Sequence, residues 1–159
     1  MTPKIATIPK KTLVGYRMRM SYAQYTVAAL WGRFMPRRKE IKNTVTNDLY
    51  SLAIYPPHHF SHFDPANEFE RWATAEVNTA DDAPEGMEVF IIPAGLYAVF
   101  TYQGLATDVA RFFQNIFQVW LPQSAYQLDD RPHFEVLGEK YKNNDPTSEE
   151  EIWIPIKMK

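Results

Sequence analysis

Two segments of this chain repeat one pattern, an apolar stripe with helical spacing that ends in a proline. When Pro36 is placed on Pro122, "ALWGRFMP" aligns with "NIFQVWLP", and hydrophobic residues fall opposite hydrophobic residues. Apolar side chains at three- and four-residue spacing indicate a helix, and a proline inside such a pattern ends or kinks it. The alignment therefore predicts an internal repeat with one helix in each half.

One strand is expected before each helix and two strands after it. Short apolar or alternating runs bounded by Pro, Gly, Asn or Asp are typical of strands. In chain order, the expected strands lie in "KKTLVGYRMRMSY", "LYSLAIY", "FERWATAEV", "AGLYAVFTYQG", "HFEVLGE" and "EEIWIPIK". The "ERW" at 70–72 matches the "EIW" at 151–153, which supports the same repeat.

The repeat predicts an α+β fold built from two β-α-β-β units that are related by a pseudo-twofold axis. The first unit spans about residues 11–77 and the second about residues 94–157, within a single domain of residues 1–159. One antiparallel sheet with both helices on one face would bury the apolar stripe of each helix. A central cleft between the halves is then the expected ligand site, because ligands commonly bind at such junctions.

The segment "RPHFEVLGEK" places a carboxylate inside a short apolar strand. Strand side chains alternate between two faces, so Glu135 shares a face with His133 and Leu137, while Phe134 and Val136 point the other way. If that face is covered, burying the ionised carboxylate costs several kcal/mol or more unless a partner compensates. An arginine or a ligand would supply that partner.

Composition is that of an ordinary soluble globular protein, with 45% hydrophobic and 23% charged residues. The formal net charge of -2 argues against attraction of the whole surface to nucleic acid or anionic lipid. The absence of cysteine excludes a disulfide, a thiol nucleophile and a thiolate zinc site. We find no signal peptide and no membrane span in the sequence, so we expect a cytoplasmic protein without a membrane partner.

Four segments together resemble the GyrI-like small-molecule-binding family, also called the AraC-type effector-binding domain. They are "PAGLYAVFTYQG", the helix end "WLPQSAY", "RPHFEVLGE" and the terminal "EEIWIPIK", and they occur in the order of the family. Residues 11–77 match in pattern more than in letters. The resemblance implies a stand-alone domain with a SOUL-like fold, in which Glu135 lies in an aromatic-lined cleft that binds cationic or polar aromatic ligands.

The high aromatic content, 14% of the residues, can supply the walls of such a cleft. A carboxylate among tyrosine and tryptophan rings attracts a cation by its charge and through the ring quadrupoles, and flat walls accept many shapes. We therefore expect capture of several planar aromatic or cationic compounds. The residues expected to bind them are Glu135 and eight aromatic residues: Tyr16, Trp31, Tyr55, Trp72, Tyr97, Phe100, Tyr126 and Trp153. For each single ring, packing in the core is an equally good explanation.

An enzyme is the second interpretation. Certain stand-alone relatives hydrolyse cyclopropane-containing aromatic compounds, and the same pocket would allow that chemistry. Burial would raise the pKa of Glu135 so that it activates water, with the hydroxyl of Tyr55 or Tyr97 as proton partner. A binding site and a hydrolase site would look alike in the sequence, so both interpretations remain open.

A regulatory protein is the third interpretation. In the family this domain often follows a helix-turn-helix segment, but residues 1–10 leave no room for one before the first expected strand. A regulator would then act through a partner such as DNA gyrase or a transcription factor, without direct contact to nucleic acid. The sequence leaves the partner and the oligomeric state open.

The loop "PPHHFSHFDPANE" holds three of the four histidines. His58 and His62 have the spacing of two metal ligands on a helical turn. Pro56 and Pro57 favour a loop instead, and the sequence offers no evident third ligand. We therefore expect neither a metal nor a cofactor.

Overall fold

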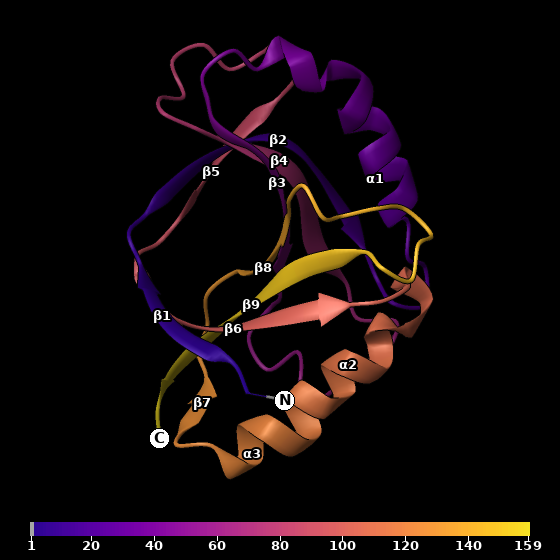
Figure 1. Cartoon of the computed structure of the whole chain (residues 1–159), viewed down its shortest axis with the longest axis vertical. Helices are drawn as coiled ribbons and strands as arrows, with labels where there is room; N and C mark the ends of the chain where they lie inside the picture. The colour runs from indigo at the N-terminus through magenta and orange to yellow at the C-terminus, as the bar shows by residue number, and fades with distance from the viewer. Residues whose placement is uncertain (1) are drawn as a thin grey trace.

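The computed structural model describes residues 2–159, and β-strands are its main element (Figure 1). The strands in this part of the chain are β1 (Lys4–Ile8), β2 (Lys11–Met20), β3 (Thr44–Ile54), β4 (Phe69–Val77), β5 (Glu88–Ile92), β6 (Gly95–Gln103), β7 (Tyr126–Leu128), β8 (His133–Leu137) and β9 (Glu149–Met158). The helical segments are α1 (Val27–Phe34), η1 (Met35–Glu40), η2 (Ala106–Asp108), α2 (Val109–Asn115), η3 (Ile116–Trp120) and α3 (Leu121–Gln123).

The strands form one antiparallel sheet that curls until its two ends meet. The strand order is β1-β6-β9-β8-β3-β4-β2-β5, with β7 paired beside β9. β1 runs on into β2 and β5 runs on into β6, and the ribbon that they form keeps one register from Lys4 opposite Val99 to Gly15 opposite Glu88. The two ends of the sheet order are therefore joined, and the strands curve around an interior (Figure 1).

Two β-α-β-β units build this sheet, as the sequence repeat predicts. β2-α1-β3-β4 is followed by β6-α2-β8-β9, and β3 pairs with β8 where the units meet. One local hydrogen bond occurs in both units: Trp72 Nε1 donates to Glu70 at 2.7 Å, and Trp153 Nε1 donates to Glu151 at 3.2 Å. These four residues are those of the matched "ERW" and "EIW" segments.

The sequence patterns do not predict β1, β5 and β7. β1 and β5 have only five residues each and are followed by Pro9 and Pro93, so little pattern marks either segment as a strand. They are strands because each pairs with a longer strand, β1 with β6 and β5 with β2. β7 has three residues and depends in the same way on β9.

The second predicted helix is present, but it is not regular along its length. Its residues run without a break through η2, α2, η3 and α3, and η3 is a wide π-helical turn. Pro122 lies directly after this turn, in α3. Proline has no N–H to donate to the preceding turn, and a π-turn is one of the ways in which a helix adapts to such a break.

Opposed side chains of paired strands point to the same face, so the curled sheet has a helix-covered face and an interior face. α1 covers β2 and β4 with Leu30 and Phe34, while Ile116 packs over β6 and β9 in a second cluster (Figure 1). The interior face holds a third cluster that includes Leu13, Leu52 and Phe134. β3 and β8 lie between the two helix-covered clusters, and this is where the site described next is found.

Candidate functional site

Glu135 lies in the middle of the helix-covered face, where the two units meet. It is the central residue of β8, opposite Ser51 on β3 and Ile152 on β9. Its side chain is 19% exposed. The alternation seen in the sequence therefore places this carboxylate on a face that is largely covered, and the cost of burial applies to it.

The charged partner of Glu135 is an arginine, Arg71 on β4. Arg71 Nη2 lies 3.8 Å from Glu135 Oε1 and donates a hydrogen bond of 2.5 Å to Ser51 Oγ. The arginine is only 6% exposed, and its Nε has no hydrogen-bond partner among residues 2–159. At 3.8 Å the two charges attract each other but do not form a hydrogen bond. The pair is therefore electrostatic, and its hydrogen-bonding capacity is only partly used.

A second carboxyl group, Glu150 on β9, points to the same face. It is opposite Tyr102 and lies two residues before Ile152, the neighbour of Glu135. Burial and then the charge of Glu135 raise the pKa of Glu150 to about 8, against the lowering effect of Arg71. Burial also raises the pKa of Glu135 against the lowering effect of Arg71. The charge of Arg71 thus acts on both carboxyl groups, and Glu150 keeps its proton near neutral pH.

Tyrosines surround these charged groups. Tyr22 and Tyr25, in the connection from β2 to α1, stack with ring centroids 5.7 Å apart at an angle of 18°, and they are 41% and 46% exposed. The hydroxyl of Tyr22 lies 2.6 Å from the hydroxyl of Tyr55. Burial raises the pKa of both stacked tyrosines, and the charges of Arg71 and Glu135 also act on it. Aromatic faces that remain exposed therefore lie beside the buried charges.

A fourth tyrosine, Tyr141, belongs to the connection between β8 and β9, which passes between α1 and α2 in the view of Figure 1. Burial raises its pKa, and the charges of Glu150 and then Glu135 raise it further. We call the following set the central site: Ser51, Arg71, Glu135 and Glu150 with Tyr22, Tyr25, Tyr55 and Tyr141.

Histidine and phenylalanine rings close one side of the central site. The edge of His133 meets the ring of Tyr55 at 5.0 Å. Burial, with contributions from Arg71 and His59, lowers the pKa of His133 to about 3, so this imidazole is neutral at pH 7. The ring of Phe60 stacks on the ring of Phe117, which belongs to η3, with ring centroids 5.1 Å apart. This stacking contact joins the loop after β3 to the second β-α-β-β unit.

Among the eight aromatic residues expected to line the cleft, Tyr55 is in the central site. Trp31, on α1, is half-buried and packs against the cluster that also includes Tyr55 and Leu137. Leu137 is two residues from Glu135 on the same face of β8. Trp31 itself packs against Phe34, with ring centroids 5.7 Å apart, in the core under α1.

Tyr16 and Phe100 lie in the same row of the sheet as Glu135, but beneath the helices. The row runs through Tyr16, Ala73, Ser51, Glu135, Ile152 and Phe100. Tyr16 is 6% exposed, and the guanidinium of Arg33 lies 4.2 Å from its ring centroid. Phe100 is buried against Trp120, with ring centroids 5.2 Å apart. Both rings pack in the cores under α1 and α2.

Trp72, Tyr97 and Trp153 point away from Glu135, into the interior of the curled sheet. Tyr97 is fully buried, and its hydroxyl donates to the carbonyl of Pro132 at 2.8 Å. The structure does not bring these three residues together with Glu135, because each lies on the opposite face of its strand. Of the two tyrosines named as proton partners, only Tyr55 is on the side of Glu135.

Tyr126 lies at the end of the sheet, on β7. It is opposite Met158, six residues beyond Ile152 on β9, and it stacks on Trp120 at 6.3 Å. At about 3.3 Å per residue, six strand residues span roughly 20 Å. The structure therefore places Tyr126 far from the central site.

Sequence reasoning did not name Arg71, Glu150, Tyr22 or Tyr25. A signal for Arg71 was present, since alternation along "FERWATAEV" puts it on one face with Phe69, just as Glu135 shares a face with apolar residues. Glu150 stands in a run of three glutamates, and such a run is typical of a solvated strand edge. The two stacked tyrosines lie outside any strand or helix, where no periodicity marks them.

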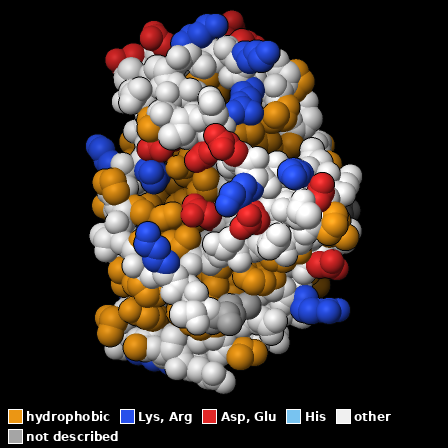
Figure 2. Space-filling view, viewed as in Figure 1, with side chains coloured by type: hydrophobic (Ala, Val, Ile, Leu, Met, Phe, Trp, Pro, Cys, Tyr) orange, Lys and Arg blue, Asp and Glu red, His pale blue; other side chains and the backbone are white. Residues whose placement is uncertain are grey.

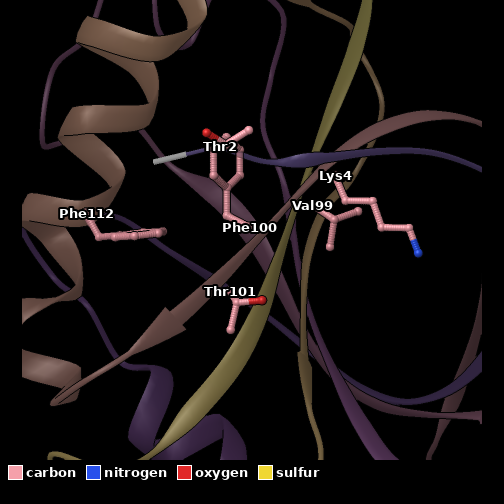
Figure 3. A pocket seen from close by; sticks show the side chains of 6 residues that line it. All are labelled: Thr2, Lys4, Val99, Phe100, Thr101 and Phe112. Carbon is pink, nitrogen blue, oxygen red and sulfur yellow. The ribbon is translucent and has the colours of Figure 1, made fainter.

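A pocket of about 270 Å³ lies apart from the central site, beside β1, β6 and α2 (Figure 3). Its lining residues are Thr2, Lys4, Val99, Phe100, Thr101 and Phe112. Lys4 is the only ionisable group in this lining. Phe100 is thus the one predicted wall residue that borders this pocket, and it does so away from Glu135.

The surface gives little indication of other kinds of site. Figure 2 shows acidic and basic side chains interspersed on one side of the molecule, with hydrophobic side chains exposed between them. Within residues 2–159, no three His, Cys, Asp or Glu side chains are placed to hold one metal ion. None of the helices described is both long enough and apolar enough to cross a membrane.

Comparisons with known proteins identify a family and several relatives. The sequence matches the GyrI-like small molecule binding domain over residues 1–157. It is 31% identical over 158 residues to the transcriptional regulator BrlR of Pseudomonas aeruginosa, covering 98% of this chain and 56% of BrlR. It is 33% identical over 98 residues to a DNA gyrase inhibitor of Erwinia billingiae, covering 58% of this chain and 61% of the inhibitor. The chain thus spans less than two thirds of the length of either relative.

The structure resembles that of SAV2435 bound to tetraphenylphosphonium. The TM-score is 0.69 and the identity 22%, with 99% of this chain and 94% of the other chain covered. At this identity the likeness shows a shared fold, the curled antiparallel sheet with two helices. Because the family match extends over almost the whole sequence, the chain belongs to the GyrI-like small-molecule-binding domain family.

Proposed function

We propose that the central site is an aromatic cleft that binds small planar aromatic or cationic compounds, with Glu135 as its floor. One observation carries this proposal. A largely buried carboxylate lies beside a stacked and exposed pair of tyrosines, Tyr22 and Tyr25, while its arginine partner is 3.8 Å away. The carboxylate therefore retains free lone pairs that a ligand can use.

The physical basis of recognition is a combination of charge and ring faces. A cation above the tyrosines is attracted by the ring quadrupoles, and in a partly dry site it is attracted strongly by Glu135 as well. Arg71 opposes this attraction, so the ligand must compete with an internal cation for the same carboxylate. Tetraphenylphosphonium bound to SAV2435, which has the same fold, is a precedent for an aromatic cation in this class of structure.

Replacing Glu135 with glutamine removes the negative charge that attracts the cation. We expect binding of tetraphenylphosphonium to weaken by about tenfold or more, which corresponds to a loss of about 1.4 kcal/mol. Glutamine keeps the size of the side chain and removes its charge. Titration followed by tryptophan fluorescence measures the dissociation constant. Triphenylphosphine oxide, which has phenyl rings but no net charge, serves as the control ligand and should bind both proteins equally. Equal binding of the cation by the two proteins would refute the role of Glu135.

Tyr25 tests the aromatic wall separately from the charge. Its hydroxyl makes no hydrogen bond with any described residue, so Tyr25→Phe should bind tetraphenylphosphonium as the wild type does. Tyr25→Ala removes the ring and should weaken binding by roughly 2- to 12-fold, equivalent to about 0.5–1.5 kcal/mol. The same fluorescence titration measures both variants. If alanine has no effect, the ligand does not rest against this ring.

Hydrolysis of cyclopropane-containing aromatic compounds is the second candidate function. The observation in its favour is that burial raises the pKa of Glu135, as a carboxylate that takes a proton from water requires. The hydroxyl of Tyr55, on the same side of the sheet, is the nearest of the proposed proton partners and is held by the hydroxyl of Tyr22. Mass analysis of each titration mixture separates the two functions. A hydrated product that is lost in Glu135→Gln would identify an enzyme.

The curated relatives raise the question of how a bound ligand would be detected. One is named a transcriptional regulator and the other a DNA gyrase inhibitor, and this chain matches only part of each. We propose, as an alternative to simple capture, that a partner protein or a neighbouring domain responds to occupancy of the central site. A ligand-dependent change in the binding of such a partner would distinguish regulation from sequestration.

A further inference from the structure

We propose that the central site exchanges a proton for its ligand: when an aromatic cation binds beside Glu135, the pair formed by Glu135 and Glu150 releases one proton to solvent. This inference rests on the proposed binding function and adds a rule for when binding occurs. The bond that breaks is one carboxyl O–H, and the proton passes to water or buffer. No other group changes its covalent state.

The arrangement that supports the exchange consists of two carboxyl groups and one guanidinium at the central site. Glu135 and Glu150 come from adjacent strands and point to the same face, and the guanidinium of Arg71 lies 3.8 Å from Glu135. None of the ion pairs among residues 2–159 includes Glu150. If both carboxyl groups were ionised, the site would carry one uncompensated negative charge in a place with little water. A proton removes that charge in the empty site, and a cation can replace the proton.

The titratable groups that face Glu150 come from every element packed against it. They are Glu135 on β8, Arg71 on β4, Tyr102 on β6, Tyr141 in the connection between β8 and β9, and Tyr25 in the connection between β2 and α1. The tyrosines are neutral at pH 7, since their pKa values are raised above the ordinary value. Tyr102 also donates its hydroxyl to the carbonyl of Leu105. Only Glu135 and Arg71 can therefore bring charge to Glu150.

The direction of the pH dependence follows from these groups. In the empty site the pKa of Glu150 is about 8, so at pH 7 the carboxyl pair still holds a proton. A bound cation favours the ionised form and lowers that pKa. Affinity for the cation should therefore rise about tenfold for each pH unit between pH 6 and pH 7, and level off above about pH 8. A neutral ligand should show no such change.

Calorimetric titration with tetraphenylphosphonium at pH 7 tests the exchange directly. Buffers with different ionisation enthalpies, such as phosphate and Tris, report the number of protons released per ligand bound. We expect about one proton for the wild type and none for Glu150→Gln, whose affinity should change less than about twofold between pH 6 and pH 8. Glu151→Gln is the matched control. The carboxylate of Glu151 is next to Glu150 in the sequence, but it is exposed and accepts a hydrogen bond from Trp153. This variant should release a proton like the wild type.

The outcomes separate this inference from the function on which it rests. Binding without proton release, or release that persists unchanged in Glu150→Gln, overturns the exchange and leaves the binding function in place. The absence of tetraphenylphosphonium binding to the wild type at any pH overturns both. Release of one proton that is lost only in Glu150→Gln supports both.

Discussion

Replacing Arg71 with methionine should lower the free energy of unfolding by about 3 kcal/mol at pH 8, because removal of one partner from a buried ion pair leaves the other charge uncompensated. Arg71 is 6% exposed, and Glu135 is the carboxylate that would remain. Methionine keeps most of the apolar stem of the side chain, so the loss measures charge more than packing. Urea unfolding followed by tryptophan fluorescence gives the value.

The loss should depend on pH in a defined direction. Arg71 lowers the pKa of Glu135, while burial raises it, so removal of the arginine leaves a pKa that is raised further. A carboxyl group whose pKa is raised in the folded state binds more protons there, so stability falls as pH rises above the unfolded value of about 4.3. Protonation of Glu135 removes the charge that needs a partner, so the loss should shrink as pH falls, to about 1 kcal/mol at pH 5.

The double variant Arg71→Met/Glu135→Gln is the control for this explanation. It removes both charges of the pair, so it should recover most of the stability that Arg71→Met loses at pH 8. Ser51, whose hydroxyl accepts the hydrogen bond from Arg71, loses that partner in both variants and does not distinguish them. A loss of equal size at pH 5 and pH 8 would show that Arg71 acts through packing alone.

The overall architecture could be predicted because its signals lie within single segments. Helical spacing before Pro36 and Pro122 is a local property, and it indicated the two helices and the repeat. β1 and β5 could not be predicted in this way. Five residues followed by a proline carry little pattern, and these strands exist because they pair with β6 and β2 in one continuous register.

The central site was predictable only in part, because it depends on which strands are neighbours. Alternation placed Glu135 on a face, and the same argument applied to β4 would have placed Arg71 on one. That the two residues meet follows from the order β8-β3-β4, which brings both strands beside Ser51. A single sequence does not specify that order.

The face to which each aromatic residue points could not be predicted for the same reason. Trp72 follows Arg71 directly in β4, and Trp153 follows Ile152 directly in β9, so neither can share a face with its predecessor. Once Arg71 and Ile152 are known to lie on the same face as Glu135, both tryptophans must face the interior. Counting aromatic residues could not reveal this, because both faces of a curled sheet need large apolar side chains.

The close approach of β2 to β4 supports the position of Arg71, and Gly15 permits it. A Cβ atom at Gly15 would overlap the carbonyl oxygen of Ala73 and lie 2.9 Å from the Cα of Thr74. These are backbone atoms of β4 and cannot rotate away as a side chain can. Ala73 is two residues from Arg71, so a shift of β4 at this point would also disturb the central site.

Gly15→Ala should therefore lower the free energy of unfolding by about 3 kcal/mol or more, since the strands must separate to admit one methyl group. Gly32→Ala is the matched control. Gly32 is exposed on α1 with no atom within 4 Å of its added Cβ, so the same change should stabilise the protein by about 0.5–1 kcal/mol through helix propensity. Urea unfolding measures both variants. Opposite signs would show that contact with β4, and not the general cost of replacing glycine, makes Gly15 necessary, whereas a neutral Gly15→Ala would mean that β4 can move without loss of stability.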